Sequence, residues 1–149
     1  MRLAAHQPQY LPWLGFFDKM DRVDRFVLLD SVQYKKNEWQ NRNRIRTATG
    51  WQWLTVPVHY RFPMTIREVE IDEIGSWRRK HREALRIQHA RCSFRDTVLP
   101  EMDALFDEPY PSLAALNPGD IVKIEERAGR PQRIVVVRRV WEELTSPEW

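Results

Sequence analysis

Two side chains capable of acid–base chemistry each follow a short apolar stretch near the start of the chain. His6 comes directly after residues 2–5, and Asp30 comes directly after residues 26–29. A histidine can act as a general acid or base, or can bind an anion when it is protonated. An aspartate in this position can orient that histidine, bind a sugar hydroxyl or hold a divalent cation. The alternative is structural: His6 would bridge backbone groups, and Asp30 would cap the following turn.

A second polar motif, Asn41-Arg42-Asn43-Arg44, is suited to binding anions and hydroxyl groups. Guanidinium groups bind phosphate or carboxylate through two parallel hydrogen bonds, and asparagine amides bind hydroxyls and carbonyls. In an extended conformation the two asparagines lie on one side of the chain and the two arginines on the other. The alternative is a polar surface loop.

A third motif, Arg78-Arg79-Lys80, falls in the first turn of a predicted helix. The helix dipole disfavours cations there, whereas a bound phosphate or carboxylate would be favoured by the free backbone N–H groups. The motif therefore indicates either an anion site or three side chains that extend into water. His81, which follows it, is expected on the apolar face of the helix.

The elements around His6 and Asp30 predict where these two side chains lie. Residues 2–5 predict a first strand, and the unbroken apolar run 26–29 predicts a strand that is covered on both faces. Between them, Pro12 is suited to the first position of a helix. Apolar side chains follow at helical spacing, and these are Trp13, Phe16, Phe17, Met20 and Val23. Strand, helix and strand predict a parallel βαβ unit, whose carboxyl edge is where open α/β sheets bind ligands.

The elements farther along the chain are predicted from periodicity, turn residues and capping residues. They are a polar loop over 33–49, a strand over 51–58, a half-exposed strand over 67–72, a helix from Trp77 capped by Ser76, a helix from near Pro100, a turn over 117–120, hairpin strands over 121–124 and 133–137, and a final helical turn over 140–144. The expected fold class is α/β, with a Rossmann-like βαβ start, a parallel sheet core, helices following it and a C-terminal β-hairpin-like tail. With 149 residues, we expect an α/β domain over 1–108 and a hairpin-rich tail over 109–149.

Charge is distributed unevenly along the chain, although the formal net charge is only +3. Residues 35–46 carry five basic side chains against one acidic, and residues 78–95 carry seven against one, before an acidic stretch over 96–108. This layout predicts an anion-facing side, and a solvated arginine-rich surface is the alternative.

The composition argues against a disordered, a membrane-spanning or a disulfide-bonded protein. Hydrophobic residues make up 42% and charged residues 30%, which argues against wholesale disorder. No apolar run approaches the roughly 20 residues of a membrane span, and the N-terminus lacks a signal-peptide pattern. The single cysteine, Cys92, excludes an internal disulfide and a cysteine metal site. Together these features predict a cytoplasmic protein.

Several spaced motifs resemble those of the WbqC-like protein family over the first two-thirds of the chain. They are His6-Gln7-Pro8-Gln9-Tyr10-Leu11-Pro12-Trp13-Leu14-Gly15, Leu29-Asp30-Ser31-Val32-Gln33-Tyr34, Asn41-Arg42-Asn43-Arg44-Ile45, Trp53-Leu54-Thr55-Val56-Pro57-Val58 and Trp77-Arg78-Arg79-Lys80-His81. The resemblance implies a role in the biosynthesis of bacterial surface polysaccharides, including O-antigen, with transfer of a glycyl or similar group onto a sugar. After about Phe106 we expect the chain to depart from the family's pattern. Residues 118–124 and 133–136 are similar instead to the C-terminal assembly domain of one of the RNA polymerase subunits.

The leading hypothesis is a transferase that moves an aminoacyl or related group onto a sugar or nucleotide-linked substrate. His6 is the expected general base, and Asp30 its orienting partner or a hydroxyl ligand. The substrate is expected to carry phosphate or carboxylate, held by Arg42, Arg44, Arg78 and Lys80. The full set of expected substrate-binding residues is Gln7, Tyr10, Gln33, Tyr34, Asn41, Arg42, Asn43, Arg44, Arg78, Lys80 and His81.

Two alternatives remain open at this stage. One is nucleotidyl transfer, because a βαβ start with proline and histidine at the strand edge is similar to nucleotidyltransferases with a histidine-rich first loop. The other is a non-enzymatic module that binds nucleic acid or a polymerase-like partner. No sequence motif specifies a cofactor or a metal site, although Asp30 together with substrate phosphates could hold magnesium.

Overall fold

The chain begins with the parallel βαβ unit that its apolar pattern predicts. Strand β1 (Leu3–His6), helix α1 (Leu14–Asp21) and strand β2 (Arg25–Leu29) follow one another, and the two strands pair in parallel with His6 opposite Leu28. A third strand, β7 (Ile134–Val137), pairs in parallel with the other edge of β2. Because β2 is the central strand and its middle is buried, its apolar run shows no alternation.

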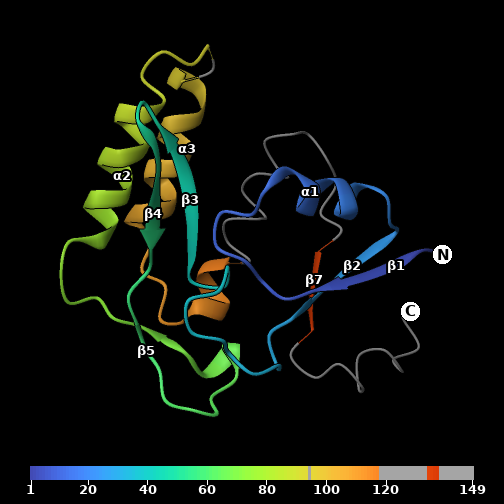
Figure 1. Cartoon of the computed structure of the whole chain (residues 1–149). Helices are drawn as coiled ribbons and strands as arrows, with labels where there is room; N and C mark the ends of the chain where they lie inside the picture. Colours follow the sequence, from blue (N-terminus) through green and yellow to red (C-terminus); the bar gives the residue numbers. More distant parts are fainter. Residues whose placement is uncertain (94, 118–133, 138–149) are drawn as a thin grey trace.

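The computed structural model describes residues 1–93, 95–117 and 134–137 (Figure 1). The strand predicted over 133–137 is present as β7. Its predicted hairpin partner over 121–124, most of the predicted turn over 117–120 and the predicted helical turn over 140–144 lie outside the described residues.

Helix α1 covers the sheet with a shorter apolar face than the sequence predicts. Phe16 and Met20 are buried and pack with Phe26 and Leu28 of the sheet. Trp13 precedes the helix in an extended conformation and is 66% exposed, so its predicted place on the buried face is wrong. The helix begins only at Leu14, because the backbone of Trp13 is not helical.

A β-hairpin replaces the second half of the loop predicted over 33–49. Strand β3 (Arg42–Thr47) pairs antiparallel with strand β4 (Gly50–Thr55). Most residues of β3 are polar or charged. The strand is therefore stabilised by its pairing with β4 and by the alternation of its two faces, rather than by a run of hydrophobic residues. The predicted strand over 51–58 is divided in two, since β4 ends before Pro57 and strand β5 (Val58–His59) begins after it.

One 3₁₀ helix, two longer α-helices and a small two-stranded sheet follow the hairpin. They are the 3₁₀ helix η1 (Ile66–Glu68), strand β6 (Glu70–Ile71), helix α2 (Trp77–Gln88) and helix α3 (Arg95–Asp107), with β6 paired to β5. The strand predicted over 67–72 is therefore only two residues long. Helix α2 begins at Trp77 as predicted, but Ser76 makes no side-chain cap bond. Helix α3 begins at Arg95, ahead of the predicted Pro100.

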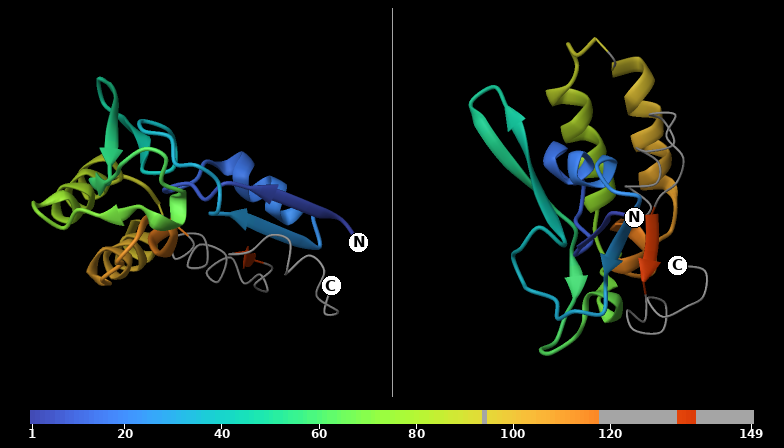
Figure 2. Two further views of the ribbon diagram at one scale, coloured as in Figure 1. Left: turned by 90° about the horizontal axis from the view of Figure 1, so that it is seen from below. Right: turned by 90° about the vertical axis from the view of Figure 1, so that its right-hand side faces the viewer.

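The elements form two lobes that lie side by side (Figures 1 and 2). The sheet lobe contains β1, α1, β2 and β7, with a core around Phe16 and Phe26. The helical lobe contains the hairpin, the β5–β6 pair, α2 and α3, with a separate core that includes Trp77 and Phe106. Leu113 and Leu116, beyond residue 108, are fully buried in this second core. The fold is mixed α/β with small sheets, and no described helix is long and apolar enough to cross a bilayer.

Replacing Phe16 by alanine tests the core of the sheet lobe. Phe16 is 1% exposed and meets the rings of Phe17 and Phe26 edge to face, so Phe16→Ala should lower the free energy of unfolding by about 3–5 kcal/mol. Urea unfolding measures this loss. Leu14→Ala on the same helix is the control, because Leu14 is 86% exposed and its loss should change stability by no more than about 0.5 kcal/mol. Similar losses in both variants would contradict the packing described for α1.

Candidate functional site

The carboxyl ends of β1 and β2 face the helical lobe. Both strands run from the free side of the sheet lobe toward the other lobe, as two perpendicular views show (Figures 1 and 2). His6 is the last residue of β1, and Asp30 directly follows β2. The parallel pairing therefore brings the two predicted catalytic residues to one edge of the sheet, next to the junction between the lobes.

The ring of His6 is held in one orientation. Its Nδ1 atom lies 2.8 Å from the carbonyl oxygen of Gln7, and the ring packs edge to face against Phe16 with centroids 5.1 Å apart. A carbonyl oxygen can only accept a hydrogen bond, so Nδ1 carries the proton of the neutral ring and Nε2 keeps its lone pair. Among the residues that the structure describes, Nε2 has no hydrogen-bond partner. His6 is thus arranged as an acceptor of a proton.

Asp30 is buried, with 3% of its surface exposed. Its backbone carbonyl accepts a hydrogen bond from the amide of Arg67 at 3.0 Å. The orienting bond to the imidazole comes from the Gln7 carbonyl rather than from the Asp30 carboxylate. The structure therefore places Asp30 at the sheet edge with its side chain buried.

The segment after β1 is tied to the loop that precedes the hairpin. The amide of Gln40 donates to the side-chain oxygen of Gln7 at 2.6 Å, and Gln40 in turn accepts from the backbone of Lys35 at 2.9 Å. Asn117 donates to the backbone carbonyl of Gln40 at 2.8 Å. Sequence reasoning missed Gln40 and Asn117, both buried, because an isolated amide side chain has no recognisable spacing.

Hydrogen bonds also join the segment after β1 to the hairpin and to the residues just before it. Asn43 donates to the carbonyl oxygens of Leu11 at 2.5 Å and of Tyr10 at 3.3 Å, and the amide of Tyr10 donates to the Trp39 carbonyl at 3.0 Å. Leu11 has a φ of 44°, which is costly for a bulky residue and is maintained only where the surroundings impose it. Asn43 is one of the predicted substrate-binding residues, and here it holds the backbone of this loop.

Tyr10 and His81 form a buried pair across the interior. The tyrosine hydroxyl lies 2.8 Å from Nδ1 of His81, and both residues are at most 4% exposed. Burial lowers the pKa of His81 to about 4, and a backbone hydrogen bond with Thr55 only partly opposes this. His81 is therefore neutral at physiological pH, and it acts as a hydrogen-bonding core residue rather than as a cation for an anionic substrate.

The three other substrate-binding residues predicted in the segment after β2 differ in their exposure to solvent. Gln33 is exposed, and its backbone forms an isolated antiparallel β-bridge with Thr65. Tyr34 is buried against Tyr60, and this burial raises the pKa of its hydroxyl to about 12. Asn41 is buried, and its amide donates to the carbonyl of Val56 at 3.0 Å.

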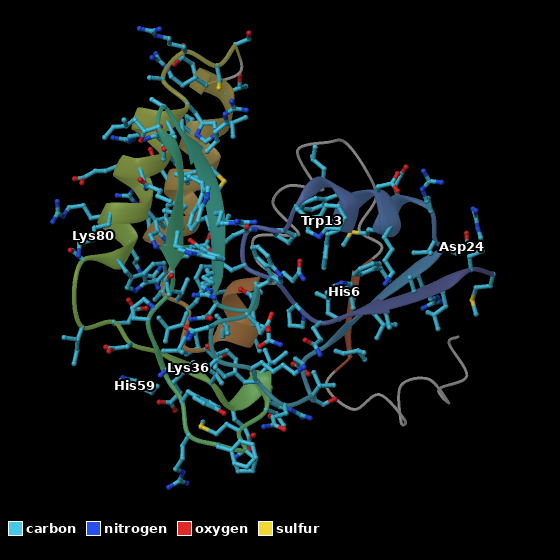
Figure 3. All side chains as sticks on the ribbon, in the orientation of Figure 1. His6, Trp13, Asp24, Lys36, His59 and Lys80 are labelled. Carbon is cyan, nitrogen blue, oxygen red and sulfur yellow. The ribbon has the colours of Figure 1, made fainter. Side chains whose placement is uncertain are left out.

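The charged residues predicted to hold the substrate contact partners other than His6. The guanidinium of Arg78 is engaged by both carboxylate oxygens of Glu73 at 2.5 and 3.0 Å and by the carbonyls of Phe106 and Glu108, so it joins α2 to the end of α3. Lys80 lies on the outer side of α2, far from His6 (Figure 3). Arg42 and Arg44 pack on the tryptophans of the hairpin.

A cleft of about 510 Å³ separates β4 from the start of α2. Its polar lining comes from both of these elements. The lining residues with polar side chains are Gln52, Thr55, Ser76, Lys80 and His81. Among the described residues, no group of three or more histidine, cysteine, aspartate or glutamate side chains is placed to hold a metal ion.

Comparisons with known proteins identify one family and one similar curated protein. The model of the WbqC-like protein family matches residues 7–140. Uncharacterized protein Rv1507c of Mycobacterium tuberculosis is 37% identical over 119 residues, which make up 78% of this chain and 51% of that protein. The chain thus spans about half the length of this curated relative. No solved structure matches it.

The family match corrects one expectation drawn from the motifs. It continues to residue 140, so the expected departure from the family's pattern after Phe106 is wrong. The stretches over 118–124 and 133–136, for which we expected a likeness to an RNA polymerase assembly domain, lie inside this match.

The buried state of His81 predicts how stability depends on pH. The unfolded chain binds a proton at this histidine below pH 6.5, whereas the folded chain resists protonation down to a pKa of about 4. Stability from this residue is therefore complete above pH 6.5 and is lost as the pH falls toward 4. Between pH 7 and pH 5 the native protein should lose about 2 kcal/mol more of its free energy of unfolding than His81→Gln, a variant that can still hydrogen-bond Tyr10 but does not titrate. Urea unfolding at the two pH values measures the difference, and equal losses would show that His81 does not remain neutral in the folded state.

Proposed function

Because this chain belongs to the WbqC-like protein family, we propose that it is a group transferase of bacterial surface polysaccharide biosynthesis, including that of O-antigen. It moves an aminoacyl group, such as glycyl, from an activated ester or thioester onto a sugar or a nucleotide-linked acceptor. The acceptor carries phosphate or carboxylate, in keeping with the excess of basic side chains.

The observation that carries this proposal is the state of His6 at the sheet edge. Its Nδ1 is fixed by the Gln7 carbonyl, which leaves Nε2 as the proton acceptor on a ring that is only partly buried. A fixed tautomer with one available nitrogen is what general-base catalysis of acyl transfer requires. The carboxyl edge of a parallel sheet is also where α/β folds bind their substrates.

The proposed step uses His6 twice. Nε2 takes the proton of the acceptor's hydroxyl or amine as that oxygen or nitrogen forms a bond to the acyl carbonyl carbon. The tetrahedral intermediate then collapses, and the bond to the donor's oxygen or sulfur breaks with its electron pair on the leaving atom. The imidazolium returns its proton to that leaving group.

The substrate class is the first thing to measure. Thermal unfolding of the purified protein should be followed with separate panels of nucleotide sugars, acyl-CoA, aminoacyl donors, and nucleoside triphosphates with and without magnesium. A ligand present at 100 times its Kd adds about 2.7 kcal/mol to the free energy of unfolding, which raises the unfolding temperature visibly. We expect a shift with a nucleotide sugar and with an aminoacyl donor. Pyrophosphate release from a nucleoside triphosphate with magnesium would indicate nucleotidyl transfer instead.

His6→Gln tests the proposed base once a substrate pair is known. Because a positioned general base contributes roughly 10²–10⁴-fold, the variant should lose about that factor in kcat while its unfolding temperature stays close to that of the native protein. His59→Gln is the matched control, since His59 is an exposed histidine of β5 and should retain full turnover. Unchanged turnover in His6→Gln would remove the proposed mechanism.

A further inference from the structure

The hairpin presents one face made of arginines and tryptophans. In the antiparallel register Arg44 lies opposite Trp53, Arg46 opposite Trp51 and Arg42 opposite Thr55. Directly opposed residues of an antiparallel pair project from the same face. The side chains of β3 therefore place three arginines in a row beside two tryptophans of β4.

The two faces of the hairpin have different surroundings. Asn43 and Ile45, which alternate with the arginines, point toward the interior, where Asn43 binds the loop after β1 and Ile45 packs against the core of the helical lobe. The arginines alternate with these two residues, so they project from the opposite face of the hairpin, and the hairpin stands beside α2 (Figure 2). Trp51 is 56% exposed, and Trp39 and Trp53 are more than one-third exposed.

The arginines of this face lie against aromatic rings. The guanidinium carbon of Arg42 is 4.1 Å from the centroid of Trp53, and that of Arg44 is 5.1 Å from Trp51, 5.5 Å from Trp53 and 5.6 Å from Trp39. Cation–π contacts hold both side chains against the rings. Arg42 also donates from Nη2 to the backbone carbonyl of Asn37, and its Nε is buried. The guanidinium of Arg44 has no hydrogen-bond partner among the described residues, so its N–H groups are able to donate. We call this surface, made of Arg42, Arg44, Arg46, Trp39, Trp51 and Trp53, the Arg–Trp face.

Charge pairing separates the Arg–Trp face from the rest of the basic surface. Arg82 of α2 pairs with Asp103 at 3.0 Å and also with Asp107, and Arg86 pairs with Asp103 at 2.5 Å. Arg78 pairs with Glu73, Arg79 with Glu83 and Arg95 with Asp96. In the part of the chain that the structure describes, five of the seven basic side chains over 78–95 are thus paired with carboxylates, and α3 supplies the carboxylates that pair with Arg82 and Arg86 of α2. Within the described residues, none of the three arginines of β3 forms an ion pair with a carboxylate. Their positive charge remains available to an anionic partner.

The shape of the face favours a polymer over a small molecule. Small-molecule sites are concave, whereas this surface is the open side of a two-stranded hairpin. Alternate residues of a strand are about 6.8 Å apart, so the arginines form a regular row of positive charges. A row of charges beside aromatic rings matches a chain that has one phosphate and one flat base in every repeating unit.

We propose that the Arg–Trp face binds single-stranded nucleic acid. The arginines contact consecutive phosphates, and bases stack on the exposed rings and on the guanidinium planes. This binding is independent of the transferase proposal, because it uses no residue of the sheet edge.

Fluorescence polarisation with a labelled 15-nucleotide oligo-dT or oligo-U tests the proposal. The plot of log Kd against log salt between 50 and 200 mM NaCl should have a slope of magnitude about 2, since each of three phosphate contacts contributes about 0.7 on single strands. Arg44→Gln should weaken binding about tenfold at 50 mM NaCl and reduce that slope by about 0.7. Trp51→Ala should weaken binding at least about fivefold through lost stacking.

Matched controls separate this face from general charge and general aromaticity. Arg79→Gln removes the same charge from an exposed arginine of α2 that is paired with Glu83, and Trp13→Ala removes an exposed tryptophan of the sheet lobe. Both should keep the native Kd within about twofold. Arg46→Gln is a second test variant on the same face, and thermal unfolding establishes that each variant is folded. His6→Gln should bind the oligonucleotide as tightly as the native chain does, which keeps this test separate from the catalytic one.

Three results would overturn the proposal. One is the absence of a polarisation change at 50 mM NaCl. Another is an equal loss of affinity in Arg79→Gln and Arg44→Gln, which would indicate attraction to net charge alone. The third is tighter binding of an anionic polysaccharide such as dextran sulfate without any dependence on Trp51, which would assign the face to a different polymer.

Discussion

The fixed conformation of residues 7–11 is the constraint on which the rest of the structure depends. Polar backbone groups that leave water must find partners, and this loop lies where the two lobes meet. The loop receives side-chain bonds from Gln40, Asn43 and His81. Those three residues belong to the loop before the hairpin, the hairpin and α2, so one short segment sets the positions of all three. The positive φ of Leu11 persists because these partners act together.

This arrangement also explains why the polar motifs of the chain have unequal roles. Tyr10, Asn43 and His81 hold the loop in place through hydrogen bonds. Arg78 joins α2 to the end of α3 through hydrogen bonds to two backbone carbonyls. His6 lies at the beginning of the same loop, and its ring is oriented by the backbone that the loop fixes. The chemistry proposed for His6 therefore rests on contacts made by residues far along the chain, and not on a neighbouring acid–base partner.

The helical lobe divides the basic side chains into two classes. Pairing α2 with α3 brings an acidic helix against a basic one, and the ion pairs between them cancel a charge that looks prominent in the sequence. The hairpin has no acidic neighbour of that kind among the described residues, so its arginines are stabilised by tryptophan rings instead. The arginines of β3 therefore remain unpaired with carboxylates within the described ranges, whereas Arg82 and Arg86 of α2 do not.

Much of the local structure is determined by the sequence alone, because it depends on the periodicity of neighbouring residues. The apolar runs around residues 2–29 predict the parallel βαβ unit and place His6 and Asp30 at one edge of it, and alternation predicts the opposite faces of Asn43 and Arg44. The strand character of residues 42–47 could not be predicted, since it depends on pairing with β4 rather than on hydrophobicity. Only the tertiary structure decides which carbonyl orients His6, which arginines are neutralised and which histidine is buried, because those properties arise from contacts between segments that the sequence does not place side by side.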